Sequence, residues 1–374
     1  MIRTSYYQDL TKMNTFGMKV KARCFMEYDS VADLVDIEFE ELARPVLHIG
    51  GGSNLLFTDD FKGTVLHSKI DFIEILEDGN CDTLERNCEP SVAISNTVLV
   101  SVGAGVVFDD FCAWAAKEGL WGVENLSYIP GEVGASAVQN IGAYGVEVKD
   151  VIHKVYCYDT FEEEFVNFDV EECCYGYRDS IFKNPEFKGR YIVTHVVFTL
   201  SRDPRPVLDY GHLKAEVERC CEERSSRHSE ERSDVGILTP ALIRKVIIKI
   251  RKEKLPEPSV VGSAGSFFKN PVITLDHFAR IESAAKAEHG PDYKVPHYDL
   301  PDGTVKVPAA WMIEQCGWKG KRSGGAAVWE KQPLVIVNYT GNAYPEEIIG
   351  LEKRIIASVK AKFGVDLHPE VEHV

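Results

Sequence analysis

The segment SYIPGEVGASAVQNIGAYG, residues 127–145, decides how the rest of the chain is interpreted. It holds too few charges for a surface loop and too many glycines for a helix. Its small residues suit a backbone that lies close against a flat ligand, and its Gln and Asn amides can hydrogen-bond the edge of a heterocycle. The structural alternative is a buried Ω-type loop. Because a long segment without a regular period is uncommon in a compact domain, we favour a binding function.

A second glycine-rich segment, HIGGGSNLL at residues 48–56, overlaps the end of the apolar run 45–49, which predicts a strand that enters a turn. Consecutive glycines permit positive φ and let backbone N–H groups converge, so this turn suits a pyrophosphate without needing positive side chains. It is not a Walker A loop, because no Lys-Ser/Thr pair follows, and it is not a G-x-G-x-x-G that opens a helix. A plain tight turn is the alternative.

The segment CYGYRDSIFK, residues 174–183, places Arg178 among aromatic and apolar residues. A guanidinium in that setting can stabilise developing negative charge or hold a carboxylate. The alternative is a purely structural ion pair with a nearby carboxylate such as Asp179. Taken alone, this segment favours the structural ion pair.

Two further segments carry polar groups next to apolar ones. In GSAGSFFKNP, residues 262–271, Gly265 allows the backbone to expose Ser266, and two Phe residues follow to pack beneath it. This serine is a candidate nucleophile, proton donor or turn residue, although no G-x-S-x-G elbow is present. In HPEV, residues 368–371, Glu370 stands where the chain ends on apolar residues, which predicts a docked tail.

Composition excludes several classes of protein. The chain has 374 residues with 42 Lys and Arg against 58 Asp and Glu, and a net charge of −16 argues against a general nucleic-acid binder. Ten cysteines without a C-x-x-C, and an N-terminus without an apolar signal region, predict a reduced, cytoplasmic, soluble protein that does not insert into membranes. No H-E-x-x-H and no Cys/His cluster with zinc spacing is present, so we expect no metal.

Apolar patterns predict a mixture of strands and helices. Strands are expected at residues 45–49, 151–158, 191–200 and 335–338, β-rich runs at 65–76 and 92–107, helices at 108–119, 213–221, 240–252 and 345–363, and an amphipathic element at 308–316. In the last helix, one face is expected to carry Ile348, Ile349, Ile355, Ile356 and Val359. The charged segment 222–234 predicts an exposed insertion or a frayed helix end. This order of elements indicates an α+β fold rather than repeating βαβ units.

Together, the ordered motifs GGGSNLL, IPGEVGAS, QNIGAYG, YRDSIFK, GSAGSFFKNP and HPEV resemble the family of UDP-N-acetylenolpyruvoylglucosamine reductases. The resemblance runs from residue 14 to residue 370, nearly the whole chain. It implies an FAD-binding domain of the PCMH, vanillyl-alcohol-oxidase-like type with two subdomains, followed by a C-terminal α+β substrate-binding domain. The domain boundaries that we expect are 1–70 and 71–202 for the two FAD subdomains, 203–330 for the substrate domain with the charged insert 222–234, and 331–374 for the elements that complete it.

The resemblance also implies an activity. A member of this family is a UDP-N-acetylmuramate dehydrogenase: noncovalent FAD takes hydride from NADPH, and flavin N5 passes it to UDP-N-acetylglucosamine enolpyruvate in the cytoplasmic synthesis of the peptidoglycan cell wall. We further expect a monomer. The cofactor-binding residues implied by matching positions are Gly50, Gly51, Gly52, Ser53, Asn54, Leu55, Ile129, Pro130, Gly131, Gly134, Ser136, Gln139, Ile141, Gly142, Tyr144 and Arg251.

By the same matching, Ser266 resembles the family's proton donor, and Arg178 and Glu370 resemble the pair that stabilises the enolate-like intermediate and aids its protonation. A serine hydroxyl is a very weak acid, so neighbouring charges must assist it. The implied substrate-binding residues are Tyr210, Lys254 and Asn270, and Tyr210 lies in DYGHL, which looks like the tyrosine loop of the longer, type I class.

One position departs from the family pattern: Glu372 stands where relatives often have Arg, so a flavin or phosphate contact there is in doubt. Two other functions compete with the reductase. One is a PCMH-type oxidase of an alcohol or lactone, which often tethers its flavin to a His or Cys, and His48 precedes the glycine run. The other is a silent flavin- or nucleotide-sugar-binding module. Denaturation of the protein distinguishes the reductase from such an oxidase, because noncovalent FAD is released from the denatured chain whereas a tethered flavin is not.

Overall fold

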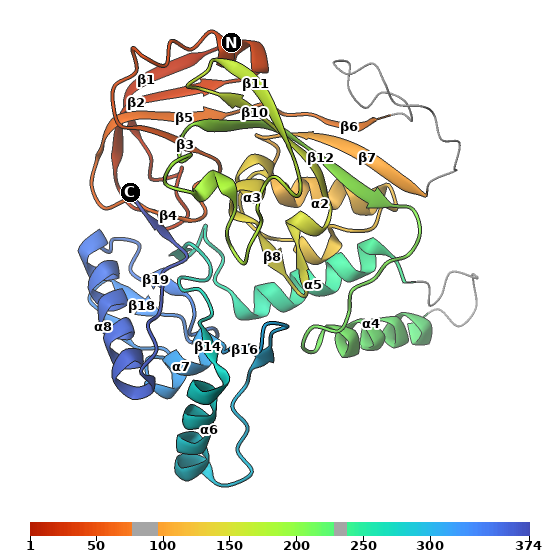
Figure 1. Cartoon of the computed structure of the whole chain (residues 1–374), viewed down its shortest axis with the longest axis vertical. Coiled ribbons are helices and arrows are strands. Elements are labelled where there is room, and N and C mark those ends of the chain that lie inside the picture. The colour runs from red at the N-terminus through yellow and green to blue at the C-terminus, as the bar shows by residue number, and fades with distance from the viewer. Residues whose placement is uncertain (77–95, 228–237) are drawn as a thin grey trace. The chain divides into compact units, whose positions relative to one another are not determined.

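The structure is a computed structural model that describes residues 1–76, 96–227 and 238–374 (Figure 1). Its contacts divide the chain into two compact units. Unit 1 comprises Met1–Gln8, Ala22–Gly51 and Lys62–Arg251, and unit 2 comprises Asp9–Lys21, Gly52–Phe61 and Lys252–Val374. These units are defined by contacts between residues, whereas the four predicted segments were defined by the ligand that each is expected to bind. The predicted domain boundaries therefore stay a prediction.

Unit 1 begins with a four-stranded sheet. Its strands, in spatial order, are β1 (Arg3–Asp9), β2 (Lys21–Tyr28), β5 (Phe61–Ser68) and β3 (Val46–Ile49). β3 and β5 are parallel, and β5 is buried along most of its length because it lies between two neighbours. The short helix α1 (Val31–Val35) begins at Ser30, whose hydroxyl accepts a hydrogen bond from the backbone N–H of Asp33.

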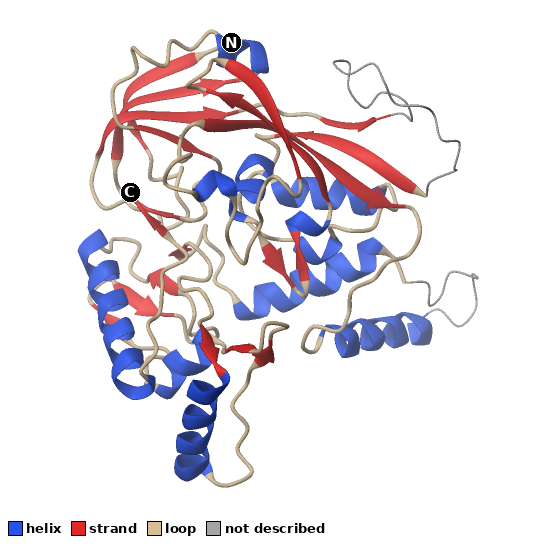
Figure 2. Cartoon of the chain, in the orientation of Figure 1, coloured by secondary structure: helices blue, strands red, loops and turns tan. Residues whose placement is uncertain are grey.

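The second sheet of unit 1 is antiparallel. Its five strands, in spatial order, are β11 (Glu164–Asp169), β10 (Ile152–Asp159), β12 (Tyr191–Ser201), β7 (Thr97–Gly103) and β6 (Ile73–Leu76). Helices α2 (Phe108–Lys117) and α3 (Val133–Gln139) lie against one face of this sheet (Figure 2). Phe111 of α2 packs on Phe198 of β12 with ring centroids 4.7 Å apart, so the main core of unit 1 lies between these helices and the sheet.

Helices α4 (Leu213–Arg227) and α5 (Pro240–Lys254) follow β12. They pack around Trp121 with the buried residues Leu213, Val217, Ile243 and Ile247. The first half of the predicted insert, 222–227, is therefore the end of a helix, whereas residues 228–234 lie outside the described part of the chain.

Unit 2 contains small antiparallel sheets and three helices. One sheet has the order β13 (Gly262–Ser263), β19 (Ile336–Asn338), β18 (Ala326–Val328) and β17 (Arg322–Ser323), and another has β14 (Val272–Thr274), β16 (Thr304–Lys306) and β15 (Tyr298–Asp299). The helices are α6 (Leu275–His289), α7 (Ala309–Gln315) and α8 (Pro345–Phe363). The tail strand β20 (Glu372–His373) pairs in parallel with β4 (Leu55–Leu56), which confirms the predicted docking of the tail.

The predictions of the strands near residues 45, 151, 191 and 335, and of the helices near 108, 213, 240 and 345, are confirmed. One face of α8 is completely buried at Ile348, Leu351, Ile355 and Val359, but Ile349 and Ile356 are only partly buried. They miss the buried face because a period of 3.6 residues carries each of them past its edge. No helix among the described residues has the length and apolarity that a membrane span requires.

One sequence-based expectation was wrong. The segment 127–145 was expected to hold too many glycines for a helix, yet α3 occupies its centre and ends at Asn140 in the left-handed conformation. Tertiary packing outweighs the low helix propensity of glycine here, because a Cβ atom on Gly134 would lie only 2.9 Å from Cβ of Ala104. A side chain at that position would push α3 away from its neighbour.

Candidate functional site

The glycine turn after β3 packs closely on the segment that leads into α3, within unit 1. A Cβ atom on Gly51 would lie 3.4 Å from Cα of Gly131, and one on Gly50 would lie 3.0 Å from Cβ of Ala135. Gly131 itself has a φ of +120°, which favours glycine. The structure therefore brings together the first two glycines of one predicted cofactor segment and the start of the other.

Tyr128, just before the predicted cofactor residues Ile129 and Pro130, is held at both of its backbone groups. Its N–H donates to the carboxylate of Asp109, and its carbonyl oxygen accepts from Nε of Arg251 at 3.1 Å. The backbone at Tyr128 has a φ of +62°, so these contacts support an uncommon conformation. Burial lowers the pKa of the Arg251 guanidinium, and the nearby Tyr144 and Asp109 side chains oppose that effect.

Asp109 is in turn bound by Arg244 of α5, whose Nη2 lies 2.9 Å from Oδ2 and whose Nη1 contacts Oδ1. Burial alone would raise the pKa of Asp109, but hydrogen bonds from Arg244 and from the N–H of Tyr128 outweigh it, so the pKa is lowered. Neither Asp109 nor Arg244 was predicted from the sequence. An acidic residue in the first turn of a helix is common, so this pattern gave no functional signal.

The polar side chains of α3 bond within unit 1. The hydroxyl of Ser136 is buried and donates to the carbonyl of Val133 at 2.7 Å, and Oε1 of Gln139 accepts from Nζ of Lys183 at 2.9 Å. After the helix, the N–H of Ile141 bonds to the carbonyl of Ser136. The flavin contacts expected for these side chains stay predictions.

Arg178 lies at the carboxyl end of α3. Its guanidinium donates to the carbonyl oxygens of Asn140, at 3.0 Å, and of Gly142, in β8 (Gly142–Ala143). Its backbone has a φ of +55°, and its guanidinium stands 5.6 Å from the centre of the Tyr177 ring. The structure therefore joins Arg178 to the predicted cofactor segment.

Tyr144 and Tyr210 meet edge to face with ring centroids 6.1 Å apart, although they are 66 positions apart in the chain. Burial raises the pKa of Tyr144, whereas the nearby Arg251 lowers it. Tyr210 is 44% exposed, so its ring can still contact a ligand. Tyr144 and Arg251, both predicted to bind the cofactor, therefore lie near Tyr210, which is predicted to bind the substrate.

In unit 2, the other half of the glycine motif holds the tail of the chain. Gly52 has a φ of +59°, and a Cβ atom there would lie 1.9 Å from the carbonyl oxygen of Met13. Asn54 donates from Nδ2 to the carbonyl of Glu370 at 3.1 Å, and its own carbonyl accepts from the N–H of Glu372 at 2.9 Å. Ser53 lies beside it, and Leu55 pairs with Glu372 in the strand ladder.

The same tail lies next to the predicted proton donor. The N–H of Glu370 donates to the carbonyl of Phe267 at 2.8 Å, and Phe268 forms an antiparallel bridge with Pro369. Both Phe side chains are 1% exposed, and Ser266 is half-buried after Gly265, which has a φ of +67°. The structure therefore joins the loop that carries Ser266 to the tail that carries Glu370 through main-chain contacts, and the catalytic roles of the two side chains stay predictions.

The two predicted substrate contacts of unit 2 differ in their surroundings. Oδ1 of Asn270 accepts from the N–H of Ala309 at 2.9 Å and so caps α7. Lys254 is exposed, and its carbonyl accepts from Nε1 of Trp329 at 3.0 Å. Across the described residues, no group of three or more His, Cys, Asp or Glu side chains is arranged to hold a metal ion.

Comparison with known proteins covers both units. The family model for the UDP-N-acetylenolpyruvoylglucosamine reductase C-terminal domain matches residues 257–374, and the FAD binding domain model matches residues 23–160. The chain is 48% identical to a UDP-N-acetylenolpyruvoylglucosamine reductase of Bacteroides fragilis over 98% of each chain. It is 41% identical to one of Porphyromonas gingivalis over 100% of this chain and 99% of the relative.

A solved structure has the same fold. The UDP-N-acetylenolpyruvylglucosamine reductase of Thermus caldophilus aligns over 100% of this chain and 98% of its own, with a TM-score of 0.60 at 22% sequence identity. The α+β arrangement that was expected for the chain is confirmed by this likeness and by the mixed elements of both units.

Proposed function

Because the chain belongs to the family of UDP-N-acetylenolpyruvoylglucosamine reductases, we propose that it reduces UDP-N-acetylglucosamine enolpyruvate to UDP-N-acetylmuramate with FAD as its cofactor and NADPH as the reductant. The observation that carries this proposal is the similarity over 98% of both chains, which leaves no large part of the relative unmatched. The reaction is a step in the synthesis of the peptidoglycan cell wall.

The residues of unit 1 fit a flavin nucleotide. Gly50, Gly51 and Gly131 present backbone without side chains, and a buried carboxylate oxygen of Glu132 beside them has no protein partner among the described residues. Such a surface accepts both phosphate oxygens, at N–H groups, and hydroxyl donors, at the carboxylate. When bound, FAD supplies two-electron chemistry between NADPH and the enolpyruvyl group.

Ser266 is the residue that we assign to proton transfer. The product gains one hydrogen at each carbon of the former double bond, so the carbon next to the carboxylate needs a proton donor. The half-buried position of Ser266 on a loop held by buried Phe267 and Phe268 supports this role, because a donor must be fixed within hydrogen-bond reach.

Arg178 and Glu370 are assigned to the pair that stabilises the enolate-like intermediate and aids its protonation: the positive guanidinium faces the negative charge that develops on the substrate, and the carboxyl group assists proton transfer. The N–H and the carbonyl of Glu370 are both hydrogen-bonded, so its backbone is fixed on each side of the carboxylate. Arg178 is fixed by two carbonyl oxygens. Preorganised charge of this kind lowers the barrier without reorganisation during the reaction. Tyr210, Lys254 and Asn270 are assigned to the nucleotide-sugar substrate.

The two half-reactions test these assignments separately. In stopped-flow experiments, Ser266→Ala should leave bleaching of the flavin by NADPH intact, and it should slow recolouring by the enolpyruvyl nucleotide by about 10²–10⁴-fold. Ser263→Ala, the same change three residues earlier in buried β13, is the control and should leave recolouring near the wild-type rate. Equal losses in both half-reactions, or none, would contradict the role of Ser266.

The same preparation can be used to test how FAD is attached and whether the protein is a monomer. We propose that FAD is bound noncovalently, so denaturation should release all of the yellow colour into the filtrate, whereas a tethered flavin would stay with the chain. We also propose a monomer that works in the cytoplasm, where NADPH and nucleotide sugars are available. Light scattering after size exclusion should give a mass near 41.9 kDa.

A further inference from the structure

Three polar side chains, Glu27, His67 and Glu132, form a row in unit 1 that ends beside the glycine turn. The two ring nitrogens of His67 face two carboxylates: Nδ1 is 3.0 Å from Oε1 of Glu27, and Nε2 is 2.9 Å from Oε1 of Glu132. A neutral imidazole donates from only one nitrogen, whereas the imidazolium donates from both. Two carboxylate acceptors therefore favour the protonated ring.

The burial of His67 alone would lower its pKa. The hydrogen bond and the charge of Glu132, together with the hydrogen bond of Glu27, outweigh burial, so the pKa of His67 is raised. The side chains of His67 and Glu132 are 4% and 9% exposed, respectively, and that of Glu27 is 25% exposed. Glu132 is thus the inner end of the row and Glu27 its outer end.

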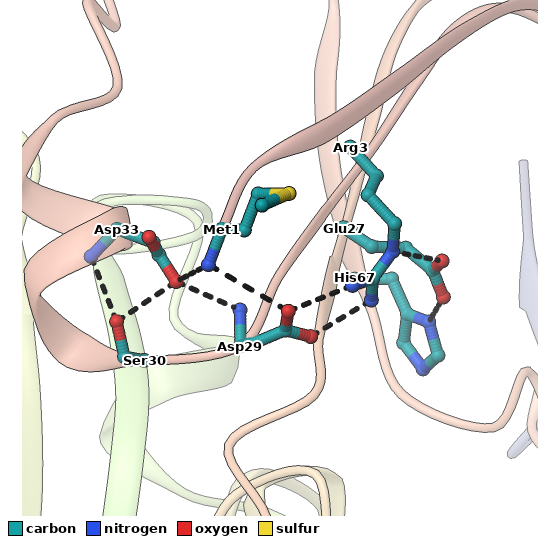
Figure 3. Close-up of polar contacts among 7 residues, drawn as sticks. All are labelled: Met1, Arg3, Glu27, Asp29, Ser30, Asp33 and His67. Atoms are coloured by element: carbon teal, nitrogen blue, oxygen red, sulfur yellow. Dashed lines mark hydrogen bonds and ion pairs between the residues drawn. The ribbon is translucent and has the colours of Figure 1, made fainter.

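The outer end is balanced by other charges. Figure 3 shows Arg3 between Glu27 and Asp29, with Nε of Arg3 3.6 Å from Oε2 of Glu27 and Nη1 2.7 Å from Oδ2 of Asp29. At the inner end, only one of the two oxygens of the Glu132 carboxylate has a hydrogen-bond partner among the described residues. Oε2 of Glu132 is buried and has no hydrogen-bond partner among the described residues. A buried carboxylate oxygen without a donor is costly and rare, which indicates that a donor arrives from elsewhere.

That oxygen lies beside the glycine turn. A Cβ atom on Gly50 would stand 3.2 Å from Oε2 of Glu132, so the absence of a side chain at Gly50 leaves the oxygen facing the turn. The turn is the place where we expect the pyrophosphate of the cofactor, and a carboxylate repels phosphate oxygens. The donors closest to a pyrophosphate in FAD are the hydroxyls of the ribityl chain and of the ribose, because the amino group of adenine and N3–H of the flavin lie at the far ends.

We propose that Glu132 binds the flavin nucleotide: with Oε1 held by His67, Oε2 accepts a hydrogen bond from a ribityl or ribose hydroxyl. The inference rests on the proposed function, because it takes FAD as the ligand. His67 is then a positioning residue, which fixes the carboxylate and neutralises its charge near a phosphate site. Glu132 lies within a predicted cofactor segment but was not among the residues predicted to bind the cofactor.

Glu132→Gln and Glu27→Gln form a matched pair, because each removes one of the two charges that face His67. We expect the dissociation constant of FAD, measured on the full chain from the fluorescence of released FAD, to rise about 10- to 100-fold in Glu132→Gln and less than about threefold in Glu27→Gln. Equal effects of both changes would mean that Glu132 merely holds His67, and an unchanged affinity in Glu132→Gln would overturn the proposal outright.

Flavin analogues, measured with the wild-type chain and with Glu132→Gln, identify which hydroxyl Glu132 binds. Wild-type chain should bind either an FAD lacking a ribityl hydroxyl or an FAD lacking a ribose hydroxyl about tenfold or more weakly, and that loss should shrink in Glu132→Gln. If every such analogue binds as tightly as FAD, or if the loss is the same in both proteins, the proposal is wrong. A wild-type chain that binds no FAD at all would instead refute the proposed function.

Discussion

Replacing Asp109 by alanine should lower the free energy of unfolding of unit 1 by about 3 kcal/mol. Asp109 and Arg244 are joined through both carboxylate oxygens, and their side chains are 24% and 16% exposed. Removing one partner costs about 3–5 kcal/mol in a fully buried pair and at most about 1 kcal/mol at the surface, so this pair falls between them at about 2 kcal/mol. The N–H of Tyr128 also loses its acceptor, which adds about 1 kcal/mol.

A double-mutant cycle isolates the pair. Asp109→Ala, Arg244→Ala and the double variant are unfolded in urea, and hydrogen exchange of peptides from α2 and α5 reports on unit 1 alone. We expect an interaction energy of about 2 kcal/mol. Asp109→Asn keeps an acceptor for Tyr128 but loses the charge, so it should recover part of the loss.

The pH dependence has a defined sign. The pKa of Asp109 is lowered in the folded chain, so the unfolded chain binds the proton more readily. The contribution of the pair is therefore complete above the ordinary pKa of aspartate, about 3.9, and is lost as the pH falls through the lower folded value. An interaction energy below about 0.5 kcal/mol at pH 7 would place the pair among surface ion pairs and refute this reasoning.

Three further predictions concern other parts of the chain. Asn14→Ala removes three buried hydrogen bonds within unit 2 and should cost about 3 kcal/mol in a urea titration. Gly52→Ala should prevent folding or lower the melting temperature strongly, because its Cβ would meet the carbonyl of Met13. Gly119→Ala, also at positive φ but with open space, should cost only about 1 kcal/mol. Burial, and then the charge of a neighbouring histidine, lowers the pKa of His48 to about 4. The unfolded chain therefore binds this proton more readily, and the folded chain should lose stability as the pH falls from about 6.5 towards 4. In a plot of the urea midpoint against pH, His48→Gln should flatten that part of the curve.

The elements that could be predicted from the sequence are those with strong local patterns. The helix α8 was predicted to the residue, because Pro345 begins it, Gly364 ends it in the left-handed conformation, and its apolar residues recur at helical spacing. α3 was missed, because its glycines lower helix propensity and the contact that requires Gly134 to be small comes from Ala104, 30 positions earlier. Local propensity cannot include a neighbour that is distant in sequence.

The same limit applies to the candidate site. Ser266 and Glu370 were recognised as polar groups in unusual surroundings, and the structure joins their loops through a hydrogen bond to Phe267. Asp109 and Arg244 stand 135 positions apart in ordinary helical patterns, so nothing in either pattern indicated that they would meet. Glu132 is the single charged residue in the segment 127–145, and this isolated charge was the signal that could have identified it.

The glycine motif after β3 has two structural roles that its sequence presents as one. Gly50 and Gly51 belong to unit 1, where their missing side chains allow close packing on Gly131, and this arrangement supports the predicted binding of a pyrophosphate. Asn54 belongs to unit 2, where its amide and carbonyl bind the backbone on either side of the carboxylate of Glu370. A change at Asn54 should therefore affect the positioning of the Glu370 carboxylate, to which we assign a catalytic role, rather than the affinity for phosphate. The motif therefore contributes differently to the two units: in unit 1 its missing side chains allow close packing, and in unit 2 it supplies the positive φ of Gly52 and the hydrogen bonds of Asn54.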